Sequence, residues 1–283
     1  MNIINPFAYH FLIKPRFKIC VNKSKNILII VHSAVSNILE RAYYRTTIGR
    51  DWIRKYFGFD IIFVIGKPSS SQMQTLIVQE AQTYGDILQG DFDDNYYNLT
   101  LKAVVWMKYI AENCGEKNQI IVKTDDDVMI DLKRLKETLL QYTEQLQNKY
   151  FCWSHKYMPI ERRSDARWYM PETEMVASHR LYDEYCSGLA YVTSMSVITK
   201  QWEYLSTHKV HFNRIDDFFV TGKLAAEAEI GHISEPSMFN IFEINLNESL
   251  NGNGTFFLMH HRNTRQFLWK KMLKKWTNSL TSS

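Results

Sequence analysis

Three consecutive carboxylates, Asp125, Asp126 and Asp127, are the residues of this chain whose types point most directly to chemistry. Adjacent carboxylates repel one another, and either water or a bound cation relieves the repulsion. Their hard oxygen atoms suit Mg²⁺ or Mn²⁺, and the coordination of such ions is commonly completed by phosphates of a substrate. On a solvated loop the same triplet would be inert, so the residue types alone leave both interpretations open.

The sequence around the triplet predicts elements that favour the metal interpretation. An apolar run with the pattern of a buried strand ends directly before Asp125. Strand patterns alternate with helical patterns along the chain, which favours a mostly parallel sheet with helices on both faces. In such sheets ligands bind outside the carboxyl ends of the strands. The predicted strands are 26–31, 60–65, 86–88, 119–124 and 188–193, and the predicted helices are 36–56, 71–84, 98–110 and 216–229, with another beginning at 131.

Polar residues and glycine set the expected ends of these helices. The serines at 69–71 offer N-caps for a helix that Gly85 would terminate. Asn98 is expected to cap the following helix. Asp131 begins a helix that carries leucines on one stripe as far as Leu146. From residue 36 to 56 no proline interrupts the helical pattern, which predicts one helix there.

The triplet is accompanied by no glycine-rich phosphate motif. Neither G-x-x-x-x-G-K-[ST] nor G-x-G-x-x-G occurs, so neither a P-loop NTPase nor a typical dinucleotide enzyme is supported. A metal-bridged diphosphate remains the natural ligand. The chemistry that fits is nucleotide-sugar transfer or a metal-dependent phosphohydrolase, and the second is disfavoured because no His/Asp cluster supplies another metal.

Length and composition exclude several classes of protein. The 283 residues carry 34 Lys and Arg against 30 Asp and Glu, and the resulting net charge of +4 is too mild to argue for nucleic acid. No apolar run approaches the roughly 20 residues of a membrane-spanning helix. We expect an N-terminal segment (1–24) without a convincing membrane anchor and a single catalytic domain (25–283). Within that domain, 25–150 would form the nucleotide-sugar half and 151–283 the acceptor half.

Four cysteines allow, but do not prove, a disulfide-forming compartment. Cys20, Cys114, Cys152 and Cys186 permit three full pairings, and none lies in a C-x-x-C spacing. The pairing is therefore left open.

Several segments of the chain resemble one known family in residue type and order. Residues 80–102 contain Tyr84-Gly85-Asp86-Ile87-Leu88-Gln89-Gly90-Asp91-Phe92 and closely resemble the characteristic motif of the β-1,3-galactosyltransferase-like enzymes, glycosyltransferase family 31. Residues 122–128, 185–192 and 216–222 are similar to later motifs of that family, in the same order. The chain departs from the family pattern at Ile48, Asp183, Asp216 and Phe218.

The resemblance implies a fold, a reaction and a compartment. It implies an α/β fold of the GT-A type with a mostly parallel central sheet flanked by helices. The implied activity is inverting transfer of a hexose, galactose or N-acetylhexosamine, from a UDP-sugar to a glycan hydroxyl in β-1,3 linkage. Family members are typically type II membrane proteins of the Golgi apparatus. A catalytically inactive, glycan-binding descendant of the same fold is the alternative.

The resemblance also implies ligands for Mn²⁺ or Mg²⁺. Asp127 is expected to bind the metal directly, while Asp125 and Asp126 serve the nucleotide ribose or metal-bound water. His260 resembles the C-terminal histidine ligand of the family, with His261 as the fallback.

The remaining expected site residues are a base and two cations. Asp217 is expected to take the proton of the acceptor hydroxyl, although an aspartate at that position could merely cap the helix at 216–229. Arg41 and Arg45 lie on one helical face and could reach the diphosphate. A solvated, salt-bridged helix face explains both arginines almost as well.

The expected partner is a glycan acceptor on a glycoprotein or glycolipid, and no nucleic acid. Residues 265–276 form a basic amphipathic pattern. Packing of this helix against the domain is the default, and contact with an anionic membrane surface is the alternative.

Overall fold

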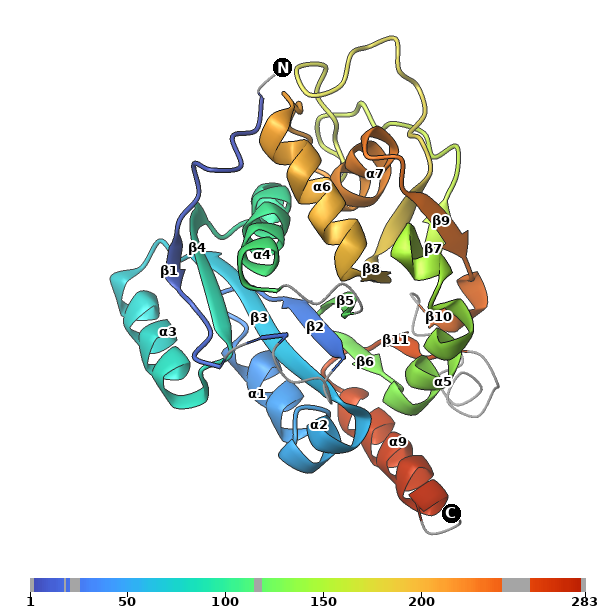
Figure 1. Cartoon of the computed structure of the whole chain (residues 1–283). Helices are drawn as coiled ribbons and strands as arrows, with labels where there is room; N and C mark the ends of the chain where they lie inside the picture. The colour runs from blue at the N-terminus through green and yellow to red at the C-terminus, as the bar shows by residue number, and fades with distance from the viewer. Residues whose placement is uncertain (1–2, 18, 21–25, 115–118, 241–254, 281–283) are drawn as a thin grey trace.

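The centre of the molecule is an eight-stranded sheet with the strand order β1-β4-β3-β2-β5-β8-β7-β9 (Figure 1). The computed structural model describes residues 3–17, 19–20, 26–114, 119–240 and 255–280. The strands of the sheet are β1 (Phe11–Ile13), β2 (Ile27–His32), β3 (Phe59–Lys67), β4 (Ile87–Asp93), β5 (Ile120–Asp125), β7 (Lys149–His155), β8 (Tyr185–Ser194) and β9 (Gly231–Ser234). The sheet thus takes strands from both the 25–150 and the 151–283 halves.

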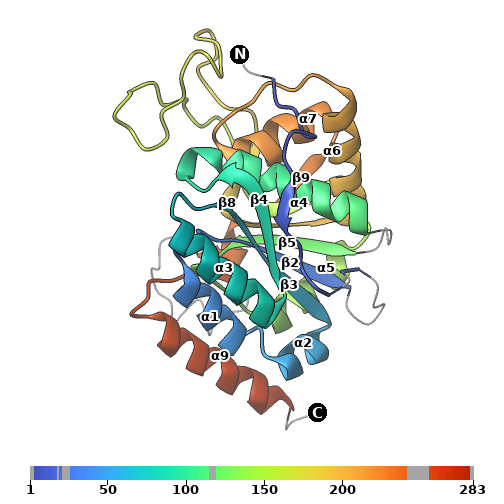
Figure 2. The same cartoon turned by 90° about the vertical axis from the view of Figure 1, so that its left-hand side faces the viewer.

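Helices cover both faces of this sheet. Figure 2 shows α4, α6 and α7 on one face and α1, α2, α3 and α9 on the other. The helices are α1 (Ile38–Thr46), α2 (Asp51–Phe57), α3 (Ser71–Tyr84), α4 (Leu99–Asn113), α5 (Leu132–Tyr142), α6 (Met195–Thr207), α7 (Leu224–Glu227) and α9 (Arg265–Leu280). Short 3₁₀ helices form at η1 (Tyr96–Asn98), η2 (Gln145–Gln147) and η4 (Pro236–Met238), and η3 (Phe218–Lys223) is π-helical. The predicted α/β class is confirmed.

Four adjacent strands, β4, β3, β2 and β5, are parallel to one another. Every residue of β2 is buried, as expected of a parallel strand that is covered on both faces and is continuously apolar. After β4 the chain crosses back to place β5 on the other side of β2. Loops therefore diverge between the carboxyl ends of β2 and β5, and such a switch point is where open α/β sheets bind ligands.

A second, three-stranded sheet lies beside the end of β5. It consists of β10 (Phe239–Asn240), β11 (Phe257–Met259) and β6 (Val128–Ile130). Strand β6 follows the aspartate triplet directly, and β11 pairs with it antiparallel, so that Met259 lies opposite Val128. This pairing brings residues near 260 to the triplet.

Two predicted helices begin as the local signals indicate. The hydroxyl of Ser70 caps α3 by accepting a hydrogen bond from the Met73 amide at 3.4 Å, and Gly85 ends the helix with a left-handed φ of 70°. Asp131 caps α5 by accepting a hydrogen bond from the Arg134 amide. However, α5 ends at Tyr142, and Leu146 lies in the separate turn η2 rather than on the same helix.

Two other predictions were wrong. The single helix expected at 36–56 is two helices, α1 and α2, and the Arg50 backbone between them is extended (φ −59°, ψ 140°). Gly49 packs so closely at this break that a Cβ there would lie 2.9 Å from the Cα of Arg45. Asn98 precedes α4 as expected but makes no side-chain capping bond; its amide nitrogen donates to the Asp93 carbonyl at 2.9 Å.

The four cysteines form two disulfides, Cys20–Cys114 and Cys152–Cys186. The first ties the segment before β2 to the residue after α4. The second joins β7 to β8 immediately before Ser187. Native disulfides typically contribute about 2–4 kcal/mol to stability.

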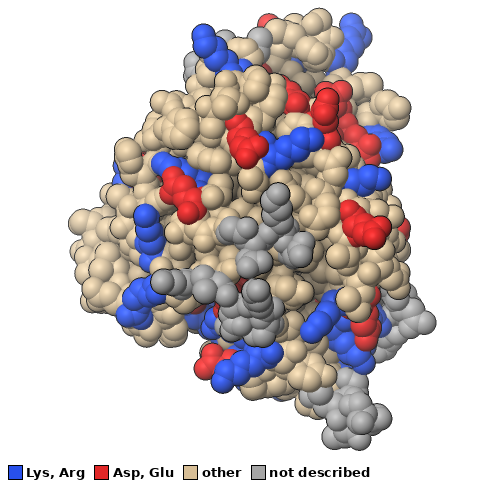
Figure 3. Space-filling view, viewed as in Figure 1, with Lys and Arg blue, Asp and Glu red and all other residues tan. Residues whose placement is uncertain are grey.

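Helix α9 packs on the domain through its apolar face. Leu268, Met272 and Trp276 are buried, and the Trp276 indole donates a hydrogen bond to Asp131 at 2.9 Å. The default expectation for this helix is therefore confirmed, and the membrane-contact alternative is not supported. No helix in the described part of the chain has both the length and the apolar composition that membrane crossing requires. On the face shown in Figure 3, positive and negative side chains are interspersed rather than gathered by sign.

Candidate active site

A cleft of about 630 Å³ opens at the carboxyl ends of β2 and β5. Its walls include the whole aspartate triplet as well as Asp216 and Asp217, which come from a segment 90 residues further along the chain. Parallel strand order thus brings together the acidic residues that the sequence singles out. The same walls contain His32, Lys102 and Lys123, which sequence reasoning did not select.

Asp126 is held by side chains from the loop after β2. Its Oδ2 accepts hydrogen bonds from the Ser33 hydroxyl at 2.6 Å and from the Asn37 amide at 3.0 Å. Burial raises the pKa of Asp126 despite these two donors. The other carboxylate oxygen takes no part in these two bonds, so Asp126 can accept a further hydrogen bond from a ligand hydroxyl.

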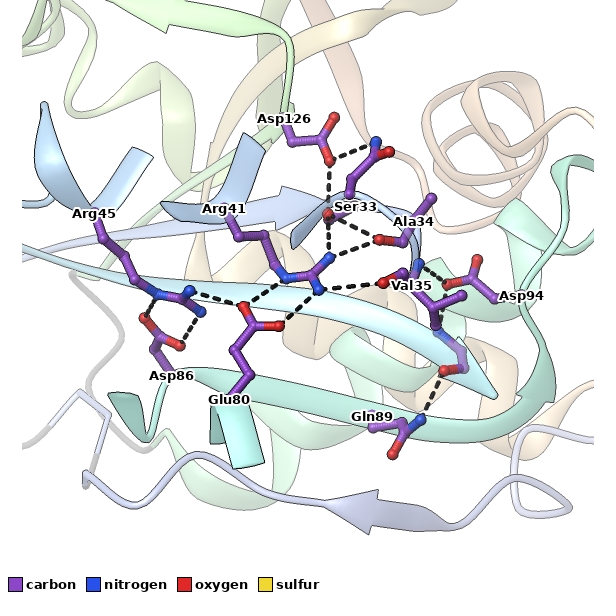
Figure 4. Close-up of polar contacts among 12 residues, drawn as sticks. Ser33, Ala34, Val35, Arg41, Arg45, Glu80, Asp86, Gln89, Asp94 and Asp126 are labelled. Atoms are coloured by element: carbon purple, nitrogen blue, oxygen red, sulfur yellow. Dashed lines mark hydrogen bonds and ion pairs between the residues drawn. The ribbon is translucent and has the colours of Figure 1, made fainter. Parts of the chain in front are cut away.

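Arg41 holds the Ser33 hydroxyl from a buried position outside the cleft. Figure 4 shows its guanidinium between Ser33 and Glu80. Arg41 donates to the Ser33 hydroxyl at 3.0 Å, to the Ala34 carbonyl at 2.6 Å and to both carboxylate oxygens of Glu80 at 2.8 and 2.7 Å. Its side chain is fully buried and does not line the cleft. Arg41 therefore acts on Asp126 through Ser33, and the structure does not place it on the wall of the cleft.

Arg45 lies further from the cleft than Arg41. It donates to Glu80 at 2.7 Å and forms a two-bond pair with Asp86 at 2.8 and 2.7 Å (Figure 4). Its guanidinium also stacks on the Tyr84 ring at 4.0 Å. Burial alone would raise the pKa of Glu80, but the hydrogen bonds and charges of the two arginines outweigh it and the pKa is lowered. The structure does not bring Arg45 to the aspartate triplet.

Two buried lysines neutralise part of the acidic cleft. The Lys123 ammonium contacts Asp125 at 2.9 Å and donates to the Gly188 carbonyl at 2.6 Å. Burial would lower its pKa, but Asp125, Asp216 and Asp217 raise it overall, so Lys123 is charged. Lys102 pairs with Asp94 at 3.0 Å and donates to the Ser33 carbonyl. In the sequence, Lys123 stands out only as a member of the motif at 122–128 and as a lysine within a buried strand.

Asp127 and His260 are neighbours through the small sheet. The His260 amide donates to the Asp127 carbonyl at 2.9 Å, and His260 is buried whereas His261 is exposed. The Asp127 side chain is accessible to solvent but sits in a recess of the protein. Partial loss of water, together with the charges of Asp125 and Asp126, raises the pKa of Asp127 to about 6. Within the described residues, no three His, Cys, Asp or Glu side chains gather as a metal-binding group.

Asp217 lies at the far wall of the cleft, against β8. Its carboxylate faces Gly188 so closely that a Cβ at that position would overlap both oxygens, and the Gly188 backbone hydrogen-bonds to it. Burial, followed by the charges of Asp216 and Asp125, raises the pKa of Asp217 well above its usual range. Its side chain makes no helix-capping hydrogen bond. The capping interpretation of Asp217 is therefore not supported.

Aromatic rings border the cleft next to Asp217. Tyr96 and Trp168 are exposed and line it, and the Arg167 guanidinium lies 5.1 Å from the first ring and 5.6 Å from the second. Sequence reasoning did not single out Trp168. Its exposure at the site could not be inferred without knowing where the 156–184 segment lies.

A family model described as Galactosyltransferase matches residues 43–236, which is more than half of the chain. The chain belongs to the galactosyltransferase family. Mouse β-1,3-galactosyltransferase 1 is 30% identical over 195 residues, which cover 69% of this chain and 58% of the relative. Human β-1,3-galactosyltransferase 2 is 29% identical over 242 residues, which cover 83% of this chain and 55% of the relative. The resemblance found in the motifs is thus confirmed, and the matched region spans little more than half the length of these galactosyltransferases.

Solved structures give a weaker likeness to this galactosyltransferase-family chain. Staphylococcus aureus TarS superposes with a TM-score of 0.42 at 11% identity and covers 83% of this chain and 37% of its own. The galactosyltransferase LgtC superposes with a TM-score of 0.39 at 10% identity and covers 87% of this chain and 94% of its own. Scores this low do not establish a shared detailed topology.

Proposed function

We propose that the protein is an inverting glycosyltransferase that moves galactose or an N-acetylhexosamine from a UDP-sugar to a glycan hydroxyl in β-1,3 linkage. One observation carries the proposal: in a chain of the galactosyltransferase family, the triplet and Asp217 line a single cleft at the switch point of the sheet. The acceptor would be a glycan on a glycoprotein or glycolipid.

The donor wall, which we define as Ser33, Asn37, Asp125, Asp126 and Asp127, would hold the nucleotide sugar. Asp126, fixed by Ser33 and Asn37, is placed to accept a ribose hydroxyl. Asp125 is held by Lys123, which limits its share of metal binding.

The chemistry of the triplet fits a divalent cation. Burial, followed by the charges of Asp125 and Asp126, raises the pKa of Asp127, and a cation would relieve the repulsion among these carboxylates. Asp127 and the neighbouring His260 are the proposed protein ligands, because carboxylate oxygen suits Mn²⁺ and Mg²⁺ and the family resemblance implies the histidine. Bound Mn²⁺ or Mg²⁺ would act as a Lewis acid that neutralises the charge of the departing diphosphate. Arg45 is not included in this proposal, because its donors are used by Glu80 and Asp86.

Asp217 is the proposed general base. A sugar hydroxyl is a weak nucleophile, and a carboxylate within hydrogen-bond reach takes its proton as the new bond forms. The raised pKa of Asp217 makes it a stronger base than an ordinary aspartate, and contact with Gly188 fixes its direction. The acceptor wall, defined as Tyr96, Arg167 and Trp168, offers flat apolar surfaces beside this base on which a sugar ring can pack.

The two disulfides support an oxidising compartment. Disulfides persist in secretory compartments and are rare in the cytosol. The lumen of the Golgi apparatus, which the family resemblance implies, meets this condition.

The test is a titration followed by a turnover assay on the full chain. UDP binding is measured by calorimetry in Mn²⁺ and in chelator, and UDP-galactose, UDP-N-acetylglucosamine and UDP-N-acetylgalactosamine are then offered with a panel of glycan acceptors. We expect UDP affinity to depend on Mn²⁺ and one donor to be turned over. Equal UDP affinity in Mn²⁺ and in chelator would contradict the metal assignment, and donor binding without any transfer would indicate the inactive glycan-binding alternative.

A further inference from the structure

His32, the last residue of β2, is a buried imidazole that the mechanism above does not use. Only 4% of its surface is exposed, and that part faces the cleft. Its position at the switch point, beside both buried lysines, places it between the two walls.

Trp106 fixes the tautomer of this imidazole. The Trp106 indole donates to the His32 Nε2 at 2.9 Å, and an indole N–H can only donate. Nε2 must therefore be the acceptor nitrogen, and in the neutral ring the proton resides on Nδ1. Trp106 is itself fully buried in α4, so this bond is held by the core.

His32 is neutral at physiological pH. Burial, followed by the charges of Lys123 and Lys102, holds its pKa well below the usual range. The only carboxylate that forms a close pair with it in the described residues is Asp216. A neutral, single-tautomer imidazole is a hydrogen-bond donor of fixed direction.

The Nδ1–H of His32 has no hydrogen-bond partner within the described residues. A buried donor without a partner is costly and rare in folded proteins. The Asp216 carboxylate is close by, with its Oδ2 3.8 Å from Nδ1, about one ångström beyond hydrogen-bond length. A small side-chain shift closes that gap.

We propose that His32 is a positioning residue that donates its Nδ1–H to Asp216 when the cleft is filled, and so keeps Asp216 ionised beside Asp217. The proposal rests on the proposed function of this cleft. An ionised Asp216 repels a second negative charge on Asp217 and thereby strengthens Asp217 as a base.

The proton balance of the step leaves His32 unchanged. The acceptor O–H bond breaks as the new glycosidic bond forms, and the proton passes to the Asp217 carboxylate. His32 cannot take that proton, because its Nε2 lone pair is already used by Trp106. Its Nδ1–H bond to Asp216 persists throughout.

Three variants separate a positioning role from a structural one. The amide nitrogen of His32→Asn reaches the position of Nδ1, whereas that of His32→Gln reaches the position of Nε2, and His32→Phe has neither. We expect kcat of His32→Asn to stay within about threefold of wild type. For His32→Gln and His32→Phe we expect kcat to fall about 10- to 100-fold with donor KM unchanged, because a hydrogen bond to a charged group is lost.

Equal kcat in all three variants would overturn the proposal, as would a change confined to donor KM, which would mean that the imidazole contacts the nucleotide sugar. A second measurement does not depend on activity or on variants. Nitrogen-15 NMR of histidine-labelled wild type should show a neutral Nδ1–H tautomer for His32. An Nε2–H tautomer would overturn the proposal even if the enzyme is active. A wild type that transfers no sugar, with the Nδ1–H tautomer present, would instead contradict the proposed function.

Discussion

The donor wall and the acceptor wall of the cleft are built in opposite ways. On the donor wall, Ser33 and Asp126 are buried, and Arg41 and Lys102 support them from beneath with hydrogen bonds inside the protein. On the acceptor wall, Trp168 is 58% exposed and comes from a segment without regular strands or helices. The side chains of the donor wall are therefore held in place by the protein without a ligand. The acceptor wall instead presents exposed aromatic surface to which a ligand can bind.

The difference in burial between the two walls would let acceptor binding change while nucleotide-sugar binding is kept. Under the proposed function, nucleotide-sugar binding would depend on buried contacts of Ser33 and Asp126, so changing them would also threaten the fold. Acceptor binding would depend on exposed side chains such as Tyr96 and Trp168, which can change at little cost to stability. The four predictions below test this division.

The largest effect is expected at Asp217, which lies between the two walls. Replacing it by asparagine removes the base, and kcat should fall about 10²- to 10⁴-fold. UDP affinity should be unchanged, because Asp217 is not part of the donor wall. Steady-state kinetics and UDP calorimetry on the same preparation measure both quantities. Transfer that survives the substitution would show that another group takes the proton.

Arg41→Met should disrupt the donor wall, because it removes the hydrogen bond that holds the Ser33 hydroxyl. The substitution leaves Glu80 and the Ala34 carbonyl with fewer buried partners, and removing one member of a buried pair typically costs about 3–5 kcal/mol. Urea unfolding should show this loss, and UDP affinity should fall because Ser33 no longer holds Asp126 in place.

Arg45→Met is the matched control for that variant. It removes another partner of Glu80 but touches neither Ser33 nor the cleft. We expect lower stability with unchanged UDP affinity. A loss of UDP affinity equal to that of Arg41→Met would restore a diphosphate role for Arg45.

Trp168→Ala tests the acceptor wall. Truncating an exposed aromatic contact should raise the acceptor KM about tenfold, while donor KM and melting temperature stay near wild type. Trp52→Ala is the control, since Trp52 is 41% exposed and does not line the cleft. Similar kinetics for both variants would mean that Trp168 does not bind the acceptor.

The smallest effect concerns pH. The pKa of Glu80 is lower in the folded protein than in the unfolded chain, so its ion pairs stabilise the fold above the usual glutamate pKa of about 4.3. That stabilisation is lost as the pH falls through and below this value. The free energy of unfolding, measured between about pH 3 and 6, should therefore fall more steeply for wild type than for Glu80→Gln. Parallel curves would show that Glu80 contributes nothing to acid sensitivity.

Local signals were enough to predict five of the eight strands of the main sheet and several helix ends, whereas β1, β7 and β9 were not predicted. Buried parallel strands such as β2 are continuous apolar runs, and Ser70 and Gly85 set the ends of α3 by interactions within a few residues. The break between α1 and α2 could not be predicted, since no proline marks it and it depends on packing at Gly49. Fold class and the position of the triplet therefore followed from sequence, and this break did not.

The site was predictable only in its acidic part. Asp126 and Asp217 carry motif and charge signals. Lys123 belongs to the same motif as Asp126, but nothing in the sequence names its partners, and His32 is the last residue of an otherwise apolar strand. Their importance depends on which strand ends meet, and β2 and β5 are far apart in sequence. For Asp217, the choice between a base and a helix cap required the geometry, which shows no capping bond.

The bond between Trp276 and Asp131 has a consequence for synthesis of the chain. Asp131 is fully buried, and this indole partner lies 145 residues further on. In a nascent polypeptide this carboxylate therefore has its partner Arg134 but lacks its indole partner until α9 has been made. A gene truncated before codon 276 would yield a chain that lacks this indole permanently. We expect such a chain to be cleaved more readily by proteases.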